Sequence, residues 1–439
     1  MRRDIHLARQ LSQLFSLTFL FTLILINGIG TTLPIPYLTL LANTFEFPLM
    51  GLVEAGYLTI SAFCSLAWGY ITDRFERKKL LGIGVVLWLI PSFTLYLSPV
   101  NLGLYVLGRW GMAVGLSTFS PLAYSLLADF AAYDDRGVIA SGLNLSWVGS
   151  SAAGILLGGL FATPTTWRTS FGVISVIGMI LLIWLFFLQM PQRARQEPAF
   201  HHLDEYDYPW RIQIFHLPEI LASRTIFWLM LQGVFALIPG TIFTYFLVSY
   251  LATGLSIPIG MASVIAITIA SGRAVGYPVF GRLGDVMMKK RETPKVRAKI
   301  AAYCMIGQAV AFFLAFLVMD SFWILFLLFS IFFWLGSFIG GGSGPNRTSL
   351  MFEVSLPEHR GSLGALFSIT DQIGAIIGII VGTLWLSVTT YSIVFIVSLG
   401  FYGVAALAWA LCIPKIDRES LQIRRILQER AQQANTQFK

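Results

Sequence analysis

The chain has 439 residues, of which 56% are hydrophobic and 12% charged, with a formal net charge of +8. Soluble domains are on average about 25% charged, so this composition excludes an ordinary soluble protein. Almost uncharged runs recur along the chain, each long enough at about 1.5 Å per residue to cross a hydrocarbon core of about 30 Å. Such segments must be helices, because lipid offers no partners to backbone N–H and C=O groups.

Twelve membrane spans are predicted from these runs, with both chain ends on one side. They lie at about 14–40, 49–72, 80–98, 102–128, 137–162, 170–190, 225–251, 258–284, 300–319, 322–352, 361–387 and 390–413. Nearly all Lys and Arg lie on the side of the termini, whereas Arg168 lies in a loop of the opposite side. By the positive-inside bias, we expect cytoplasmic termini and a place in the cell membrane, plasma or inner.

A polar, proline-rich stretch divides the chain near its middle. We predict an N-terminal six-helix bundle (1–195), a cytoplasmic linker (196–222), a C-terminal six-helix bundle (223–414) and a cytoplasmic tail (415–439). The tail mixes apolar and basic residues at helical spacing, which favours an amphipathic helix resting on the anionic leaflet. Two histidines beside acidic residues in the linker lack the spacing of metal ligands, so we expect no metal site there.

The two halves repeat each other in sequence. Gly69-Tyr-Ile-Thr-Asp73 returns as Gly281-Arg-Leu-Gly-Asp285, at an offset of 212 (285 − 73). At an offset of 224, Pro121, Asp129, Arg136, Gly154 and Gly158 recur as Pro345, Glu353, Arg360, Gly378 and Gly382. Internal repeats of this kind build many transporter folds, so the repeat favours a transporter.

The segment from Gly69 to Lys79, between the second and third spans, resembles the signature loop of the major facilitator superfamily. It reads Gly69-Tyr-Ile-Thr-Asp73-Arg74-Phe-Glu-Arg77-Lys78-Lys79 and is echoed from Gly281 to Lys290. With twelve spans and a central linker, the resemblance covers essentially the whole chain. It implies an all-α membrane fold of two pseudo-symmetric six-helix bundles around a central cavity, and rocker-switch alternating access.

Within the superfamily, the first half is similar to the spinster-like group, which is associated with sphingolipid or lysophospholipid export. The similarity is carried by Asp73-Arg74-Phe-Glu-Arg77-Lys78, Arg109, Ala128-Asp129-Phe130 and Arg136. That group typically has a Glu a few residues after the span-four Arg, and this chain has none there. Span five resembles the antiporter motif, with Ile155 in place of the usual proline, so drug–proton antiport is an alternative.

Charged residues at the cytoplasmic ends of the spans are the first group of candidate functional residues. We expect Asp73, Arg77 and Asp129 to form a charge latch that closes in one state and breaks in the other. Asp285 and Lys289, with the second-half acid of span ten, would duplicate it. The alternative is ordinary interfacial charges, because exposed ion pairs contribute only about 0–1 kcal/mol. The candidate gating residues are Asp73, Arg74, Arg77, Lys78, Asp129, Arg136, Asp285, Lys289, Glu353 and Arg360.

Ionisable residues deep in the spans are the second group. Each costs at least about 2.5 kcal/mol at the bilayer centre and normally faces a partner or a cavity. The candidates are Arg109, Arg273, Arg347, Glu54 and Asp371. Glu54 is only about five residues from the outer end of its span, roughly 7 Å at helical rise, which favours an interfacial placement. Arg109 is expected to serve substrate binding or coupling, with a structural helix contact as the alternative.

The depths of Arg273 and Asp371 match to about one turn, which indicates a salt bridge between them. If Asp371 instead faces a cavity, it is the best candidate for a proton-coupling carboxylate, because desolvation favours the neutral carboxyl group. Arg347 follows a glycine run that lets the helix bend, which indicates a hinge or a ligand contact. Three deep arginines against at most two deep acids favour an anionic head group. Further polar contacts are expected from Asn27, Gln232, Tyr245 and Asn346.

Small residues are expected to bring helices into close contact at Gly154, Gly158, Gly159, Gly378 and Gly382. The sequence has no phosphate-binding Gly-Lys-Ser/Thr loop and no catalytic triad, so neither an enzyme nor a cofactor is expected. We predict a secondary transporter for a small organic, anionic or amphiphilic solute. Proton-coupled drug efflux and a non-transporting membrane sensor or scaffold are the alternatives. Expected partners are a small-molecule or lipid-like substrate, H⁺ or Na⁺ and the bilayer, without nucleic acid, and a monomer is expected.

Overall fold

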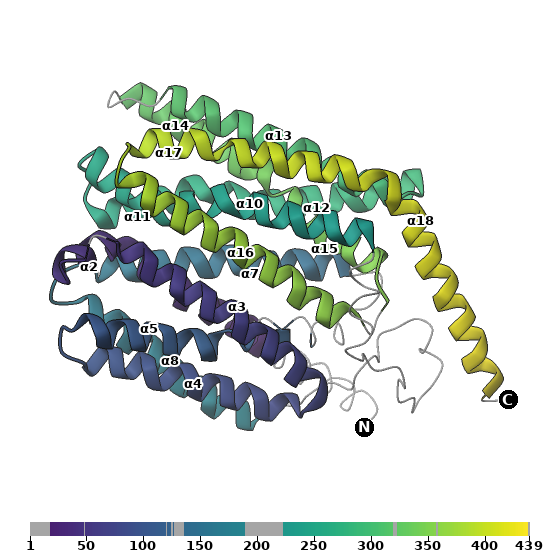
Figure 1. Ribbon diagram of the computed structural model, residues 1–439, viewed down its shortest axis with the longest axis horizontal. Helices are drawn as coiled ribbons and strands as arrows, with labels where there is room; N and C mark the ends of the chain where they lie inside the picture. Colours follow the sequence, from purple (N-terminus) through teal and green to yellow (C-terminus); the bar gives the residue numbers. More distant parts are fainter. Residues whose placement is uncertain are drawn as a thin grey trace, which may run out of the picture.

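The structure is a computed structural model that describes residues 18–47, 49–119, 121–123, 126, 136–188, 223–318, 323–356 and 359–437. Within these ranges the chain forms helices and no strands. The helices run side by side in two groups that follow one another in the sequence (Figure 1). We refer to these groups as the N-half and the C-half.

The N-half begins with a helix in the span Thr18–Thr44, which ends in η1 (Ile35–Tyr37) and α2 (Leu38–Thr44). It continues with α3 (Met50–Arg74), α4 (Arg77–Leu97), α5 (Leu102–Leu116), α7 (Arg136–Leu160) and α8 (Trp167–Phe186). The C-half contains α10 (Arg224–Ser249), η5 (Tyr250–Gly254), α11 (Ile259–Ala270), α12 (Gly272–Arg291), α13 (Lys295–Leu317), α14 (Trp323–Gly340), α15 (Ser343–Glu353), α16 (Arg360–Leu386), α17 (Tyr391–Ser398) and α18 (Gly400–Gln437).

Ten helices in the described ranges are long and apolar enough to cross a membrane. The other two predicted spans fall on α5 and α7, where part of the chain lies outside the described residues. The prediction of twelve spans is therefore consistent with the structure, and the all-helical membrane fold is confirmed.

Three spans of the C-half consist of two helices in line. α11 meets α12 at Ser271, α14 meets α15 at Gly341 and Gly342, and α17 meets α18 at Leu399. At the second of these breaks, a Cβ on Gly341 would lie 2.8 Å from backbone atoms of Gly276 in α12. Glycine is required at Gly341 because the two backbones approach so closely, and the break lies in the glycine run where a bend was predicted.

The same helix contact occurs in both halves. A Cβ on Gly154 of α7 would lie 2.8 Å from the carbonyl oxygen of Ile29 in the first span. A Cβ on Gly158 would collide with the carbonyl oxygen of Leu33, one turn further along the same span. In the C-half, a Cβ on Gly378 of α16 would lie 2.6 Å from the carbonyl oxygen of Ile238 in α10. In the N-half α7 thus packs directly on the backbone of the first span, and in the C-half α16 packs directly on the backbone of α10.

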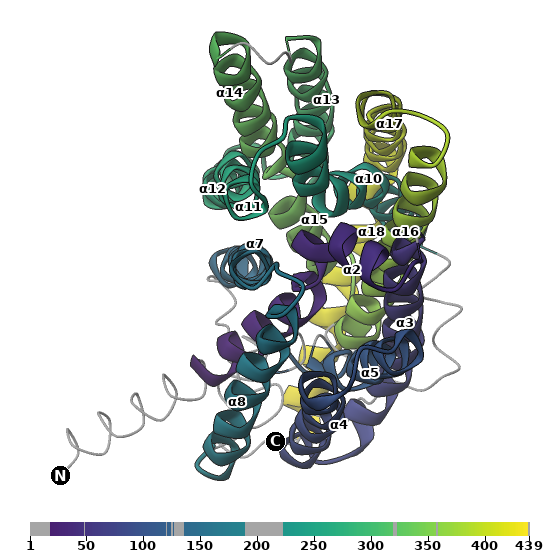
Figure 2. The same cartoon turned by 90° about the vertical axis from the view of Figure 1, so that its left-hand side faces the viewer.

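The halves meet along two seams, where α3 packs on α16 and α7 packs on α11 and α12 (Figure 2). We use "tail end" for the end of the molecule with the α3–α4 turn and the last turns of α18, and "far end" for the opposite end (Figure 1). At the far end Gly51 of α3 lies against Thr383 of α16, and Gly159 of α7 lies against Ser263 of α11. The Thr39 hydroxyl also donates to the Ser249 hydroxyl at 3.4 Å. Small side chains therefore form these far-end contacts.

Candidate functional site

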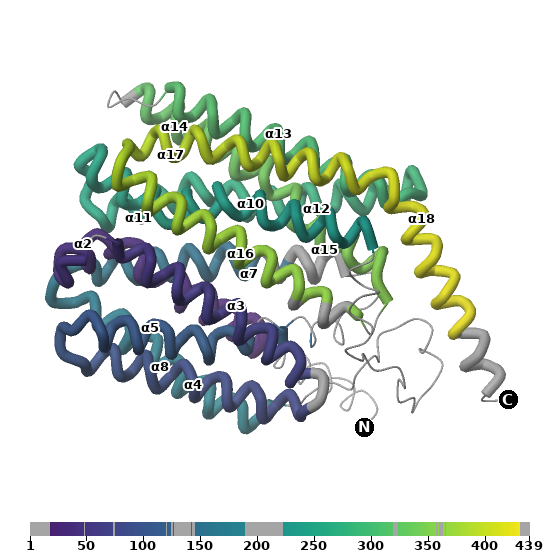
Figure 3. Tube along the Cα trace, in the orientation of Figure 1, coloured from purple at the N-terminus to yellow at the C-terminus, as the bar shows by residue number. Residues whose placement is uncertain are grey.

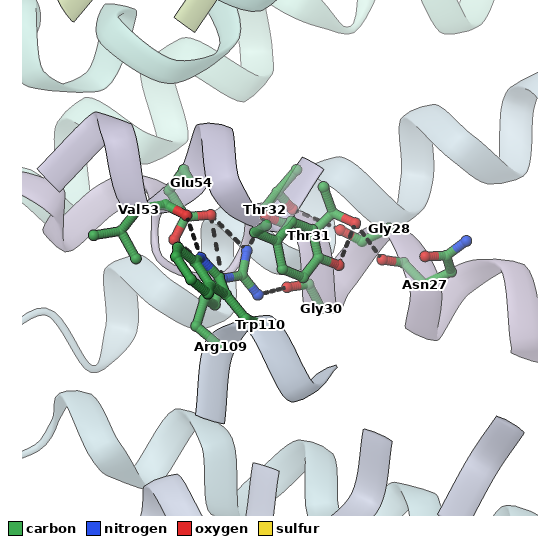
Figure 4. A network of polar contacts seen from close by, with 10 residues as sticks. Asn27, Gly28, Gly30, Thr31, Thr32, Val53, Glu54, Arg109 and Trp110 are labelled. Carbon is green, nitrogen blue, oxygen red and sulfur yellow. Dashed lines mark hydrogen bonds and ion pairs between the residues drawn. The ribbon is translucent and has the colours of Figure 1, made fainter. Parts of the chain in front are cut away.

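A fully buried ion pair joins α5 to α3 in the N-half (Figure 4). The side chains of Arg109 and Glu54 are both 0% exposed, and Nη2 of Arg109 lies 2.7 Å from Oε2 of Glu54. Nε of Arg109 donates to both carboxylate oxygens, at 3.0 and 3.2 Å. Nη1 donates to the carbonyl oxygen of Gly30, and Nη2 to that of Thr31 at 2.8 Å. Every nitrogen of the guanidinium group therefore has an acceptor, which is the condition for burying such a pair.

Aromatic side chains enclose this pair. Cζ of Arg109 lies 3.8 Å from the centre of the Tyr57 ring, a cation–π geometry. The Tyr57 hydroxyl shares a 3.2 Å hydrogen bond with the Thr31 hydroxyl. The next residue, Trp110, donates from Nε1 to the carbonyl oxygen of Val53 at 3.0 Å. Two consecutive residues of α5 are thus tied to two consecutive residues of α3, which makes this part of the N-half rigid.

The predicted interfacial placement of Glu54 is wrong. Its carboxylate is sealed from solvent because α5 brings Arg109 beside it, at a similar distance from the end of the span. Matching the depth of Glu54 with that of Arg109 would have indicated this pair.

A second ion pair joins α15 to α16 in the C-half. Nη1 of Arg347 lies 2.8 Å from both carboxylate oxygens of Asp371, and Nε donates to the carbonyl oxygen of Leu229 in α10 at 3.2 Å. Gly233 of α10 makes the room, because a Cβ there would collide with both side chains. The side chains of Arg347 and Asp371 are 11% and 32% exposed, so solvent or a ligand can reach the carboxylate.

The predicted salt bridge between Arg273 and Asp371 is wrong. The side chain of Arg273 lies instead beside the hydroxyl of Tyr402 in α18. That hydroxyl accepts from Nε2 of Gln308 at 3.2 Å. Arg273 has no carboxylate partner in the part of the chain that the structure describes. Depth along a span predicted the level of both residues correctly but carries no information on which way each helix faces.

The four predicted polar contacts are all buried: Asn27, Gln232, Tyr245 and Asn346 are 7%, 2%, 4% and 0% exposed. Nδ2 of Asn346 donates to the carbonyl oxygens of Phe280 at 3.2 Å and Gly342 at 2.8 Å, which ties α15 to α12. The Tyr245 hydroxyl and the Gln232 carbonyl oxygen have no hydrogen-bond partner among the described residues.

The predicted latch residues of the C-half pair within their own half. Asp285 accepts from Arg297 Nη2 at 2.6 Å, whereas Lys289, its predicted partner, is exposed. Glu353 accepts from Arg424 of α18 at 3.3 Å. The sequence did not indicate Arg297 as the partner of Asp285, because the prediction used the spacing between acid and base found in the first half.

In the N-half, Lys78 donates to the carbonyl oxygens of Phe186 at 3.1 Å and Leu188 at 2.9 Å, where it satisfies the last carbonyls of α8. Arg77 is buried at 9% exposure. Asp129 and the predicted linker 196–222 lie outside the described residues, as do the side chains of Asp73, Arg74, Arg136 and Arg360. The N-half latch therefore stays a prediction.

The tail is helical, and α18 continues without interruption from the last span to Gln437 (Figure 3). Asp417 accepts from the Thr293 hydroxyl at 2.7 Å and pairs with Lys295 at 2.8 Å. The carboxylate of Glu419 accepts from the hydroxyl of Ser223 at 2.6 Å. With the Arg424–Glu353 pair, these contacts fix α18 to the tail-end termini of α10, α13 and α15.

The family model described as "Major Facilitator Superfamily" matches residues 20–294 and, a second time, residues 229–432. The chain belongs to the major facilitator superfamily. It is therefore a multi-pass membrane protein of a family of transporters, not of enzymes. The superfamily assignment predicted from the signature loop is confirmed.

Curated relatives include spinster proteins and an efflux pump. Protein spinster of Drosophila melanogaster is 24% identical over 202 residues, which cover 45% of this chain and 33% of that protein. Protein spinster homolog 3 of Danio rerio is 24% identical over 181 residues, covering 40% and 35%. Efflux pump dotC of Dothistroma septosporum is 27% identical over 139 residues, covering 31% and 24%. The chain thus spans about a third or less of the length of these relatives.

Solved structures match over nearly the whole chain. A bacterial homolog to the human lysosomal transporter Spinster, inward-facing and unoccupied, aligns with a TM-score of 0.72 and 15% identity, covering 93% of this chain and 98% of that one. The same homolog in its occupied form aligns with a TM-score of 0.63. These matches show the fold, and with the curated relatives they confirm the spinster-like resemblance.

Proposed function

We propose that this transporter is a secondary active one, which moves a small organic, amphiphilic solute with an anionic group by rocker-switch alternating access. The observation that carries the proposal is the distribution of strong and weak contacts. Each ion pair that the described residues form with one another joins elements of the same half. The far-end contacts between the halves include Gly51, Gly159 and small hydroxyl side chains. Two halves that are each held together by internal ion pairs, with no ion pair between them among the described residues, can rotate against each other as rigid bodies.

Arg273 supports an anionic group in the solute. Two of the three deep arginines are neutralised, Arg109 by Glu54 and Arg347 by Asp371. Arg273 lies beside the neutral phenol of Tyr402, and a guanidinium group stays charged at any physiological pH. A charge deep in a membrane span without a counterion is costly, so an incoming anion is favoured there.

Asp371 supports coupling to protons. Its carboxylate is 32% exposed, whereas Glu54 is sealed, so Asp371 is the deep acid that a proton can reach. Protonation would release Arg347 from α16, which changes the contact of α15 with its neighbours. Proton-coupled drug efflux would share this coupling, and one relative is named an efflux pump. A cytoplasmic tail end is supported by the basic residues gathered there.

Flux into proteoliposomes tests the proposal. The purified protein is assayed with fluorescent lysophosphatidate, fluorescent lysophosphatidylcholine, succinate and glucose, under a pH gradient or a sodium gradient. We expect gradient-driven movement of at least one anionic solute, and pH-insensitive flux in Asp371→Asn. Asp417→Asn, which removes a tail-end carboxylate, should keep its pH response. Flux of no solute under either gradient would leave the sensor or scaffold as the better hypothesis.

A further inference from the structure

Three polar side chains from three helices meet inside the C-half at Tyr402 of α18. Tyr402 and Gln308 of α13 are buried, at 1% and 0% exposure, and Nε2 of Gln308 donates to the Tyr402 hydroxyl at 3.2 Å. Arg273 of α12 lies beside the same hydroxyl and is partly exposed. We refer to these three residues as the phenol cluster. It holds one positive charge and, in the part of the chain that the structure describes, no negative one.

The phenol cluster has a hydrogen-bond donor to spare. A phenol hydroxyl can accept and donate at once. The Tyr402 hydroxyl accepts from Gln308, and its own proton has no acceptor among the described residues. Exchanging the oxygen and nitrogen of the Gln308 amide would give this proton an acceptor, but it would leave the amide N–H groups without one. In either orientation a buried donor beside the Arg273 charge is unused, which is the arrangement that an anion would complete.

A glycine of α10 leaves the Tyr402 hydroxyl uncovered. Outside α10, a Cβ on Gly240 would have one described atom within 4 Å, the Tyr402 hydroxyl oxygen at 3.8 Å. Gly240 is partly exposed. Thr244, one turn further on, is exposed and donates to the Gly240 carbonyl oxygen at 2.8 Å. Gly240 and Thr244 therefore mark a side of α10 that a solute can reach, with the phenol cluster next to it.

The corresponding place in the N-half is closed by packing. Tyr402 lies 224 positions after Gly178 of α8 (402 − 178), the offset that relates the two halves over the preceding spans. α8 packs on α4 as α18 packs on α13. A Cβ on Gly178 would lie 2.7 Å from the ring of Trp88 in α4, which is fully buried. An indole ring over a glycine thus suffices to close this place, so the polar side chains of the phenol cluster indicate a role other than packing.

We propose that the phenol cluster binds a singly charged oxyanion of the solute, a carboxylate or a phosphodiester. Arg273 supplies the charge, Tyr402 donates its hydroxyl proton to the anion, and Gln308 positions this hydroxyl. One guanidinium charge is balanced by one negative charge, whereas a doubly charged phosphate monoester would leave an excess charge deep in the membrane. The site rests on the anionic solute proposed above, and it adds the charge of the anionic group and two residues that recognise it.

Calorimetric titration of the purified protein in a maltoside detergent tests the site without transport. The probes are octanoate, octyl phosphate, which is doubly charged above its second pKa of about 6, and neutral octanol, with empty micelles as the blank. Octanoate should bind more tightly than octyl phosphate. Tyr402→Phe removes only the hydroxyl, so it should weaken octanoate binding about ten-fold, the effect of one charged hydrogen bond, and leave octanol unaffected. Tyr303→Phe of α13, which is 74% exposed, is the matched control and should bind as the wild type does.

Gln308→Glu gives a second measurement. It places a carboxylate beside Arg273, so it should raise the melting temperature and abolish octanoate binding, because the site then holds its own anion. Gln422→Glu, on the exposed tail, adds the same charge and should change neither. A wild type that binds no octanoate, wild-type affinity in Tyr402→Phe or Gln308→Glu, or a lower melting temperature in Gln308→Glu would overturn the proposal. The expected binding results without flux of any solute would support the site and count against the proposed function alone.

Discussion

The two deep ion pairs, Arg109–Glu54 and Arg347–Asp371, differ in how far they are enclosed. Arg109 and Glu54 are sealed and saturated, so they hold the first span, α3 and α5 together. Arg347 and Asp371 are less enclosed, and Nη2 of Arg347 has no acceptor among the described residues. The first pair is suited to rigidity and the second to exchange of a proton or a ligand group.

Breaking the sealed pair should unfold the N-half at lower temperature. Glu54→Gln or Arg109→Gln leaves one buried charge without its counterion, which typically costs about 3–5 kcal/mol. The double variant should lose less than the sum of the singles, because no bare charge remains. Thermal unfolding in detergent measures both effects. Lys79→Gln, which breaks an exposed pair with Glu76, is the control and should unfold as the wild type does. Unchanged single variants would show that the pair is dispensable.

Arg273→Gln should change which solutes are carried. If Arg273 holds an anionic group, the variant loses uptake of anionic solutes by about ten-fold or more, as expected for a charged hydrogen bond, and keeps neutral ones. Competition between fluorescent lysophosphatidate and its neutral glyceride analogue measures this preference. Arg425→Gln, an exposed tail residue, should leave the preference unchanged. An equal loss for charged and neutral solutes would indicate a structural role for Arg273.

For single residues, the sequence predicted the depth of a charged side chain along its span but not its partner. Glu54, Arg109, Arg347 and Asp371 were all recognised from the cost of a charge inside a span. The pairing depends on rotation about each helix axis, and rotation is set by packing that involves many helices. That is why Asp371 meets Arg347 and not Arg273.

Between elements, glycines decide how closely the helices approach. Gly158 faces the backbone of the first span, where the carbonyl oxygen of Leu33 occupies the place of a Cβ, whereas Gly149 of the same helix has nothing within 4 Å. Gly382 faces the ring of Phe246, which can move more easily than backbone. The predicted packing glycines therefore differ in how much a methyl group would cost.

Gly158→Ala and Gly149→Ala form a matched pair in α7. Gly158→Ala should destabilise the protein by about 1–3 kcal/mol, because backbone must move to admit the methyl group. Gly149→Ala should be neutral or stabilising by up to about 1 kcal/mol, since alanine favours helix and finds open space. Thermal unfolding in detergent compares them. If both variants behaved alike, close approach of α7 to the first span would not limit stability.

The repeat was predictable where it shows as identical residues, at the offsets of 212 and 224. It did not predict the partner of Asp285, because that partner, Arg297, lies at the start of α13 and not at the spacing of Lys289. Which basic side chain reaches an acid depends on neighbours in space, so the Asp285–Arg297 pair required the fold.

At the scale of the whole molecule, the fold follows from twelve spans and an internal repeat, and the superfamily match confirms it. What the sequence could not provide is where the halves touch. The far-end contacts use glycine and hydroxyl side chains, which are common throughout the spans and carry no distinctive signal. Yet these contacts must separate if the halves rock, so they offer the most direct control of transport.

Joining the halves at the far end should stop transport. A disulfide between Thr39→Cys and Ser249→Cys would hold α2 to α10, and flux should fall to background until a reductant restores it. A matched disulfide within one half, Ser92→Cys with Ser175→Cys, joins α4 to α8 at hydroxyl positions 3.0 Å apart. It should leave flux intact, because a rocking half moves as one body. If the first bridge left transport running, the far end would not need to open; if the second stopped it, the N-half must change shape internally, and rigid-body rocking would be the wrong description.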